Sequence, residues 1–162
     1  MQLQKYQGQD TPCPNRSKER YKTRKQECWI RWKRQFIADN ESGAAATFAV
    51  LPEGEPVGEG TLLFSPECRG IRGRLALADG KTVCNINALR IRKEYEGKGY
   101  VSALVKEMER YARSLGYQRV TIGVEAAEAR NLAIYLHWGF TEFLMTEGEG
   151  QELVLYYGKH LT

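Results

Sequence analysis

The sequence predicts an α/β fold in which helices pack against a mixed sheet. Alternating apolar residues at Val120, Ile122 and Val124 indicate a strand, whereas the apolar residues of 101–115 recur at helical spacing. Elements of both kinds follow one another in the order β, α, β-β-β, α, β, α, β-β. With 162 residues, of which 42% are hydrophobic, the chain is expected to form one domain over 1–162 with its own core.

The N-terminal half is expected to hold four strands and one or two helices. The expected strands are 3–6, 46–51, 57–64 and 83–91, and the helical part spans 17–39. The sequence Pro52-Glu53-Gly54-Glu55 is typical of a hairpin turn, and 65–73 and 78–81 are expected to be loops. Apolar residues alternate unevenly over 83–91, which indicates a β-bulge.

The C-terminal half begins with the clearest element, a helix over 101–115. Seven residues keep helical spacing there, and Gly116 is a natural helix stop: Val101, Leu104, Val105, Met108, Tyr111, Ala112 and Leu115. A strand over 120–125 and a short helix over 130–138 are expected next. A last hairpin, with strands at 140–145 and 153–157, would turn around Gly148-Glu149-Gly150.

Cysteine and histidine usage argues against a metal site. The four cysteines lie far apart, no Cys-x-x-Cys pair occurs, and the chain has only two histidines. These cysteines are typical of reduced thiols in a cytoplasmic protein. No run of about 18 apolar residues occurs and the N-terminus lacks the apolar part of a secretory signal, so no membrane segment is expected.

Positive charge is concentrated near the N-terminus. The net charge of the chain is +4, but residues 16–34 carry +7, which leaves −3 for the remainder. Cys28, Trp32 and Phe36 recur every four residues, so the basic side chains are interpreted as the solvated face of an amphipathic helix. A surface for an acidic substrate or for nucleic acid is the less favoured alternative.

A glycine turn between a strand and a helix is the main candidate binding element. Gly97 and Gly99 flank Lys98, and the absence of Cβ atoms would let successive N–H groups converge on an anion. The following helix N-terminus also favours negative charge. The alternative interpretation is a plain strand-to-helix turn. The spacing of a P-loop is absent, and Ser102 stands where a dinucleotide fingerprint needs glycine or alanine.

Two segments in the expected order resemble one known family. Residues 89–104 resemble the acetyl-CoA motif of the GNAT acetyltransferase superfamily, Arg/Gln-x-x-Gly-x-Gly/Ala after a bulged strand. Residues 135–140, Tyr-Leu-His-Trp-Gly-Phe, are similar to the superfamily's Leu-Tyr-x-x-x-Gly-Phe segment. Glu96 stands at the usual Arg/Gln position and Val101 at the usual Gly/Ala position, which are departures from the pattern.

The resemblance implies a single-domain GNAT-like α/β fold, with a mixed, mostly antiparallel central sheet of six to seven strands and about four helices. It implies acetyl-CoA as the acyl donor, bound in a wedge between strands 88–91 and 120–125 and at the glycine turn, and no metal. The residues implied in cofactor binding are Leu89, Arg90, Ile91, Glu96, Gly97, Lys98, Gly99, Tyr100, Val101, Ser102 and Asn131.

The same resemblance implies the catalytic groups. Tyr135 is expected to donate a proton to the departing thiolate, with aromatic packing as the alternative role. Glu125 is the leading candidate base, and Glu59 and Glu128 compete with it. His137 follows Tyr135 by two residues and is expected to face elsewhere.

We therefore expect an N-acetyltransferase that moves an acetyl group from acetyl-CoA to a primary amine of a small molecule or peptide. The alternative is a non-catalytic acyl-CoA-binding or sensor module on the same fold. The expected partners are acetyl-CoA and an amine acceptor, with neither a membrane nor nucleic acid among them. Exposed strand edges would permit a homodimer.

Overall fold

The computed structural model describes residues 2–5 and 26–162, and it describes the side chains of residue 5 and of 32–162. Neighbouring strands are hydrogen-bonded in the order β1-β2-β3-β4-β5-β7-β6. The strands are β1 (Gln2–Lys5), β2 (Ala45–Leu51), β3 (Gly58–Leu63), β4 (Val83–Ile91), β5 (Arg119–Glu125), β6 (Glu142–Glu147) and β7 (Val154–His160). The helices are α1 (Gln26–Ser42), α2 (Tyr100–Ser114) and α3 (Ala129–His137), with 3₁₀ turns at η2 (Lys93–Tyr95) and η3 (Gly150–Glu152).

The predicted order of strands and helices is confirmed, and the fold is the α/β class expected. The described residues contain three α-helices, against about four predicted. The part of the predicted helix before residue 26 lies outside the described residues, as does most of the basic segment 16–34.

The chain divides into two compact units, and each is described by itself. The first unit comprises 1–61 and 88–105, and the second comprises 62–87 and 106–162. The division passes through β3, β4 and α2, so each of these elements contributes to both units. The single domain expected over 1–162 stays a prediction.

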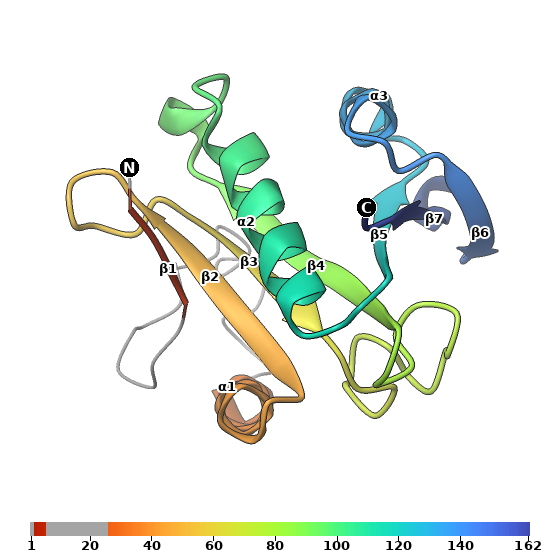
Figure 1. The fold of residues 1–162 in the computed structure, drawn as a ribbon, viewed down its shortest axis with the longest axis horizontal. Coiled ribbons are helices and arrows are strands. Elements are labelled where there is room, and N and C mark those ends of the chain that lie inside the picture. Colours follow the sequence, from red (N-terminus) through yellow and green to blue (C-terminus); the bar gives the residue numbers. More distant parts are fainter. Residues whose placement is uncertain (1, 6–25) are drawn as a thin grey trace. The chain divides into compact units, whose positions relative to one another are not determined.

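In the first unit, β1 pairs antiparallel with β2, and α1 lies beside β2 (Figure 1). Trp32 and Phe36 are half-buried and stack with their ring centroids 5.4 Å apart, as the four-residue spacing predicted. The Asn40 side chain ties the helix to β2 because its Oδ1 accepts a hydrogen bond from the Thr47 N–H at 2.9 Å.

In the second unit, β5, β7 and β6 lie side by side (Figure 1). Strands β5 and β7 are antiparallel, as are β6 and β7, while β4 and β5 pair in parallel. The core of this unit contains fully buried residues from several elements: Leu62, Ile71, Leu77, Met108, Val120, Ile122 and Phe140.

A buried polar network joins β4 to β5 in the second unit. The Asn85 amide donates to Thr121 Oγ1 at 2.9 Å, and Thr121 Oγ1 donates to the Leu77 carbonyl at 2.8 Å. Because both side chains are buried, these bonds satisfy groups that would otherwise be costly to desolvate. The network also anchors the loop that contains Leu77 to β5.

Gly116 terminates helix α2, as the sequence predicted. Gly116 has φ +90°, its N–H donates to the Arg113 carbonyl, and the Tyr117 N–H donates to the Ala112 carbonyl. This pair of bonds is a Schellman motif. Leu115 was predicted to share the apolar face but is 51% exposed, because the helical conformation already ends at Ser114.

Candidate functional site

The glycine turn of the first unit has the backbone conformation predicted for it. Gly97 has φ +74° and Gly99 has φ +81°, values that L-residues with a side chain rarely adopt. Lys98 is exposed, and its ammonium lies 5.2 Å from the centroid of the Tyr95 ring. The turn therefore leads directly from η2 into α2 with only glycine at its two left-handed positions.

The turn and the first residues of α2 present a run of N–H groups. The first intrahelical-type bond runs from the Ala103 N–H to the Gly99 carbonyl at 3.0 Å. Within the described part of the chain, the N–H groups of 97–102 donate no hydrogen bond to the protein. Donors left over at a helix N-terminus are suited to an anion, and the helix dipole adds to that preference.

The parallel register of β4 with β5 covers only the first part of β4. The paired residues run from Val83↔Arg119 to Ile86↔Ile122, whereas β4 continues to Ile91. Two residues after the last pair, Ala88 has φ +53°, the backbone irregularity that the uneven alternation predicted. Leu89, Arg90 and Ile91 follow this irregularity.

On its other side this end of β4 lies close to β3. A Cβ atom on Gly58 would lie 3.0 Å from the Arg90 carbonyl oxygen, a close contact that favours glycine at this position. The Arg90 guanidinium pairs with the buried Glu59 carboxylate, Nε to Oε1 at 3.1 Å. Glu59, one of the candidate bases, is thus an ion-pair partner of Arg90.

Tyr135 lies in the second unit, where the Tyr-x-x-x-Gly-Phe pattern forms the end of α3. Gly139 has φ +94°, the Gly139 N–H donates to the Leu136 carbonyl, and the Phe140 N–H donates to the Tyr135 carbonyl. The Tyr135 ring contacts the rings of Trp138 and Phe140, with centroids 5.8 Å and 6.4 Å away. The pattern therefore encodes a second Schellman motif, and the Tyr135 ring packs against two neighbouring rings at the end of α3.

The surroundings of Tyr135 shift the pKa of its phenol. Burial, and after it the nearby Glu128 carboxylate, raise the pKa of Tyr135 above its ordinary value. The phenol therefore stays protonated throughout the neutral pH range. Glu128 in turn accepts a hydrogen bond from the Asn131 amide. Asn131 lies one helical turn before Tyr135 on α3.

The side chains of the candidate base Glu125 and of His137, the histidine near Tyr135, are exposed. Glu125 is the last residue of β5, and His137 lies at the end of α3. All cofactor residues of 89–102 belong to the first unit, whereas Glu125, Asn131 and Tyr135 belong to the second.

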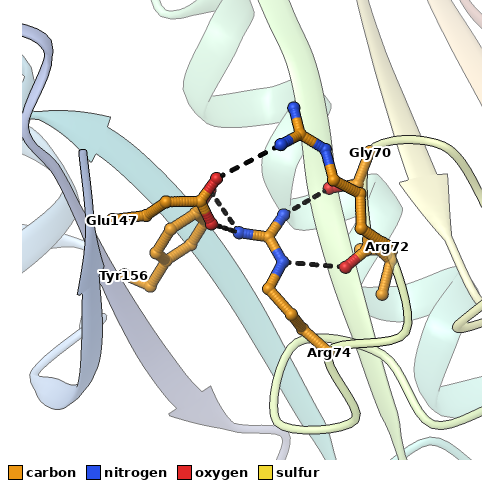
Figure 2. Close-up of polar contacts among 6 residues, drawn as sticks. Gly70, Arg72, Arg74, Glu147 and Tyr156 are labelled. Carbon is orange, nitrogen blue, oxygen red and sulfur yellow. Dashed lines mark hydrogen bonds and ion pairs between the residues drawn. The ribbon is translucent and has the colours of Figure 1, made fainter.

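Sequence reasoning overlooked a polar cluster in the second unit, drawn in Figure 2. Arg74 donates to the Gly70 and Ile71 carbonyls, each at 2.7 Å, and to the Tyr156 hydroxyl at 3.1 Å. Its guanidinium also pairs with Glu147 and lies 5.1 Å from the centroid of the Tyr156 ring.

Arg72 completes this cluster. Its Nη1 lies 3.5 Å from Glu147 Oε1, so one carboxylate is shared by two guanidinium groups (Figure 2). We call Arg72, Arg74, Glu147 and Tyr156 the arginine cluster. Its two arginines lie more than 70 positions before Glu147 and Tyr156 in the sequence, so no local pattern indicated that they meet.

Among residues 2–5 and 26–162, no group of three or more His, Cys, Asp or Glu side chains is arranged to hold a metal ion. In the same part of the chain, no helix has the length and apolar character needed to span a membrane.

Comparison with known proteins identifies the family. The model of the Acetyltransferase (GNAT) family matches residues 5–140, which is most of the chain, and the protein belongs to that family. It is an acyltransferase of the GNAT type at this general level. No curated protein matches the chain significantly in sequence.

Solved structures with the same fold have low sequence identity to the chain. A GNAT family acetyltransferase from Elizabethkingia anophelis with acetyl-CoA bound has a TM-score of 0.63 at 13% identity, covering 99% of this chain and 97% of its own. A ribosomal-protein-alanine N-acetyltransferase from Brucella melitensis has a TM-score of 0.62 at 19% identity, with coverage of 82% and 78%. An N-acetyltransferase from Staphylococcus aureus has a TM-score of 0.60 at 14% identity, with coverage of 82% and 78%.

Proposed function

We propose that the protein is an acetyl-CoA-dependent N-acetyltransferase acting on a primary amine. The observation that carries the proposal is the run of N–H groups at 97–102, in a chain of the GNAT family. Two glycines with positive φ, Gly97 and Gly99, aim this run, and a helix N-terminus adds its partial charge. These features favour the pyrophosphate of acetyl-CoA as the anion.

Residues on the end of β4 are proposed to bind the rest of the donor. The backbone groups of Leu89, Arg90 and Ile91 would pair with the pantetheine arm, and one N–H group would polarise the thioester carbonyl. This role is supported by the end of the β4–β5 pairing at Ile86, because the residues beyond it do not pair with β5. Acetyl-CoA bound to a GNAT family acetyltransferase of similar fold adds support.

The proposed chemistry is direct attack in a ternary complex. The amine nitrogen forms a bond to the thioester carbon while the carbon–sulfur bond breaks. The proton lost by the amine passes to Glu125, through water, and the thiolate of CoA takes the phenolic proton of Tyr135. Glu125 then releases its proton to solvent, and solvent returns a proton to Tyr135. The raised pKa keeps Tyr135 protonated at neutral pH but also makes its phenol a weaker acid, so the donor role rests on the place of Tyr135 in the GNAT pattern.

The test combines binding and turnover. Acetyl-CoA at about 100 times its dissociation constant should stabilise the protein by about 2.7 kcal/mol, a rise of roughly 5–10 °C in the melting temperature. A panel of primary amines should then release free CoA thiol from acetyl-CoA. Matched samples of acetyl-CoA with protein but no amine, and with amine but no protein, serve as the turnover controls.

The outcomes separate the two expected roles. A stabilised protein that releases thiol with at least one amine supports the transferase. Stabilisation without thiol release from any amine would leave the acyl-CoA-binding or sensor module as the function. Absence of stabilisation at saturating acetyl-CoA would contradict both.

A further inference from the structure

The arginine cluster and Glu125 lie on one face of the β5–β7 pair. Cross-strand partners share a face, and residues two apart on a strand share it too. Gly123 pairs with Tyr156 and Glu125 pairs with Val154, so Tyr156 and Glu125 point to the same side. A Cβ atom on Gly123 would lie 2.8 Å from Tyr156 Cε1, which shows that the ring lies across Gly123.

Helix α2 covers the opposite face of the same strands. Lys159 pairs with Val120, and its ammonium contacts both oxygens of Glu109 of α2, at 2.8 Å and 3.0 Å. Thr121, on the Gly123 side, instead contacts the Leu77 carbonyl. The loop that carries the two arginines therefore covers the face that α2 leaves open.

The charges of the arginine cluster do not balance. Arg72 and Arg74 share the single carboxylate of Glu147, which leaves one positive charge in excess. Arg74 is held by two backbone carbonyls and is only 17% exposed, so its position is set by the fold. Arg72 is 73% exposed and contacts Glu147 through one nitrogen, so most of its five donors face solvent.

These features are suited to a small anion of planar shape. A guanidinium group offers paired donors that match a carboxylate, and such bidentate contacts are among the strongest hydrogen bonds in proteins. Glu125 stands two residues beyond Gly123, at roughly 7 Å along the strand. A molecule with both a carboxylate and an amine could thus contact Arg72 with the first while Glu125 takes a proton from the second.

We propose that Arg72, supported by Arg74, binds the carboxylate of the acceptor, so that the acceptor class is a carboxylate-bearing primary amine. The inference rests on the proposed function, since it names the acceptor of that reaction. Arg72 is a specificity-determining residue here, and Arg74 is a positioning residue that acts through Glu147 and Tyr156.

The experiment compares acids with their amides. A panel of α-amino acids and dipeptides, each with its matched carboxamide, is assayed for CoA thiol release from acetyl-CoA. Wild-type protein should show a kcat/KM for acids at least ten-fold above that for amides. Arg72→Gln should remove that preference, a loss of about ten-fold or more for acids alone, as expected for hydrogen bonds between charged groups.

Matched variants distinguish binding from a structural role. Arg69→Gln removes the same charge from an exposed position of the same loop and should leave the acid preference intact. Glu147→Gln removes the carboxylate that both arginines contact, and with it the link through which Arg74 positions Arg72, so the preference for acids should weaken while the kcat/KM for amides stays constant. The melting temperature and the KM for acetyl-CoA are measured for every variant, and both should match wild type in Arg72→Gln.

Three results would overturn the inference while the proposed function stands. In the first, wild-type protein acetylates the amides as fast as it acetylates the acids. In the second, Arg72→Gln lowers the kcat/KM for acids and for amides by the same factor. In the third, amines that lack a carboxylate release thiol and no acid of the panel does. Failure of acetyl-CoA to stabilise the protein, together with no thiol release from any amine, would instead reject the proposed function and the inference with it.

Discussion

The glycine turn of the first unit and the arginine cluster of the second offer positive charge in two different ways. At the turn, the donors are backbone N–H groups of 97–102, aimed by two glycines with positive φ. In the arginine cluster, the donors are guanidinium groups that are positioned by contacts with Glu147 and Tyr156. The first arrangement depends on backbone conformation and the second on side-chain identity.

This difference determines how much a changed side chain should affect binding at each of the two places. Glu96 and Val101 differ from the family pattern, yet the turn adopts the required conformation because Gly97 and Gly99 are present. A backbone site can accept such changes, since every residue except proline carries an N–H group. The arginine cluster has no such tolerance, because replacing Arg72 or Arg74 removes the donors themselves.

The largest expected effect concerns a side chain of the second unit. Tyr135→Phe should lower kcat by about ten-fold to 100-fold, because it removes the proposed proton donor, while the affinity for acetyl-CoA stays constant. Steady-state kinetics with a good acceptor and direct titration of acetyl-CoA measure the two quantities. Tyr157→Phe deletes the same hydroxyl elsewhere in the unit and is the control. Unchanged kcat in Tyr135→Phe would leave the residue with its packing role alone.

The next effect tests the backbone site. Gly99→Ala introduces a Cβ atom at φ +81°, which costs about 1–2 kcal/mol and turns the N–H groups away from the ligand. Acetyl-CoA affinity should fall about ten-fold. Gly43→Ala has the same φ of +81° and open space around it, so it carries the same strain outside the proposed site. Equal affinities of the two variants for acetyl-CoA would contradict the pyrophosphate assignment.

A third prediction concerns the Asp79 carboxylate, which accepts hydrogen bonds from several backbone N–H groups. Burial alone would raise the pKa of Asp79, but hydrogen bonds from the Val83, Lys81 and Thr82 N–H groups and the Thr82 hydroxyl hold it well below its usual range. A lowered pKa contributes stability that is complete above the unfolded value of about 3.9 and is lost as the pH falls.

Asp79→Asn should therefore reduce the free energy of unfolding by about 1–2 kcal/mol at pH 7, and the difference from wild type should shrink below about pH 4. Urea denaturation at pH 7 and at pH 3 measures both values. Glu67→Gln, at an exposed carboxylate of the same unit, should show neither effect. A difference that is constant with pH would show that the charge of Asp79 is not what the N–H groups stabilise.

The smallest expected effect concerns Glu96, which precedes the glycine turn. Glu96 is exposed beside the run of N–H groups, and a carboxylate there repels a pyrophosphate. Glu96→Gln should tighten acetyl-CoA binding by about two-fold to five-fold, the size expected for one exposed charge near a helix N-terminus. The gain should diminish at high salt. Glu94→Gln, two residues earlier in η2, is the comparison variant, and an equal gain there would indicate a general charge effect.

Local pattern was sufficient for most of the fold. Helices and strands appeared in the predicted order because apolar periodicity and glycine stops act within a few residues. Gly116 and Gly139 end α2 and α3 by the same pair of backbone bonds, which short-range sequence encodes directly. Leu115 shows the limit, since spacing placed it on the apolar face although the helix had already ended.

The sequence by itself determined the family, the glycine turn and the pattern around Tyr135, because each depends on residues close together in the chain. Tertiary structure alone decided the ion pair of Glu59 with Arg90 and the assembly of the arginine cluster. Those contacts join residues from separate strands and loops, and strand pairing is what brings them together. Spacing along the chain carries no record of such pairings, so the proposed role of Arg72 and Arg74 in acceptor binding could emerge only from the folded protein.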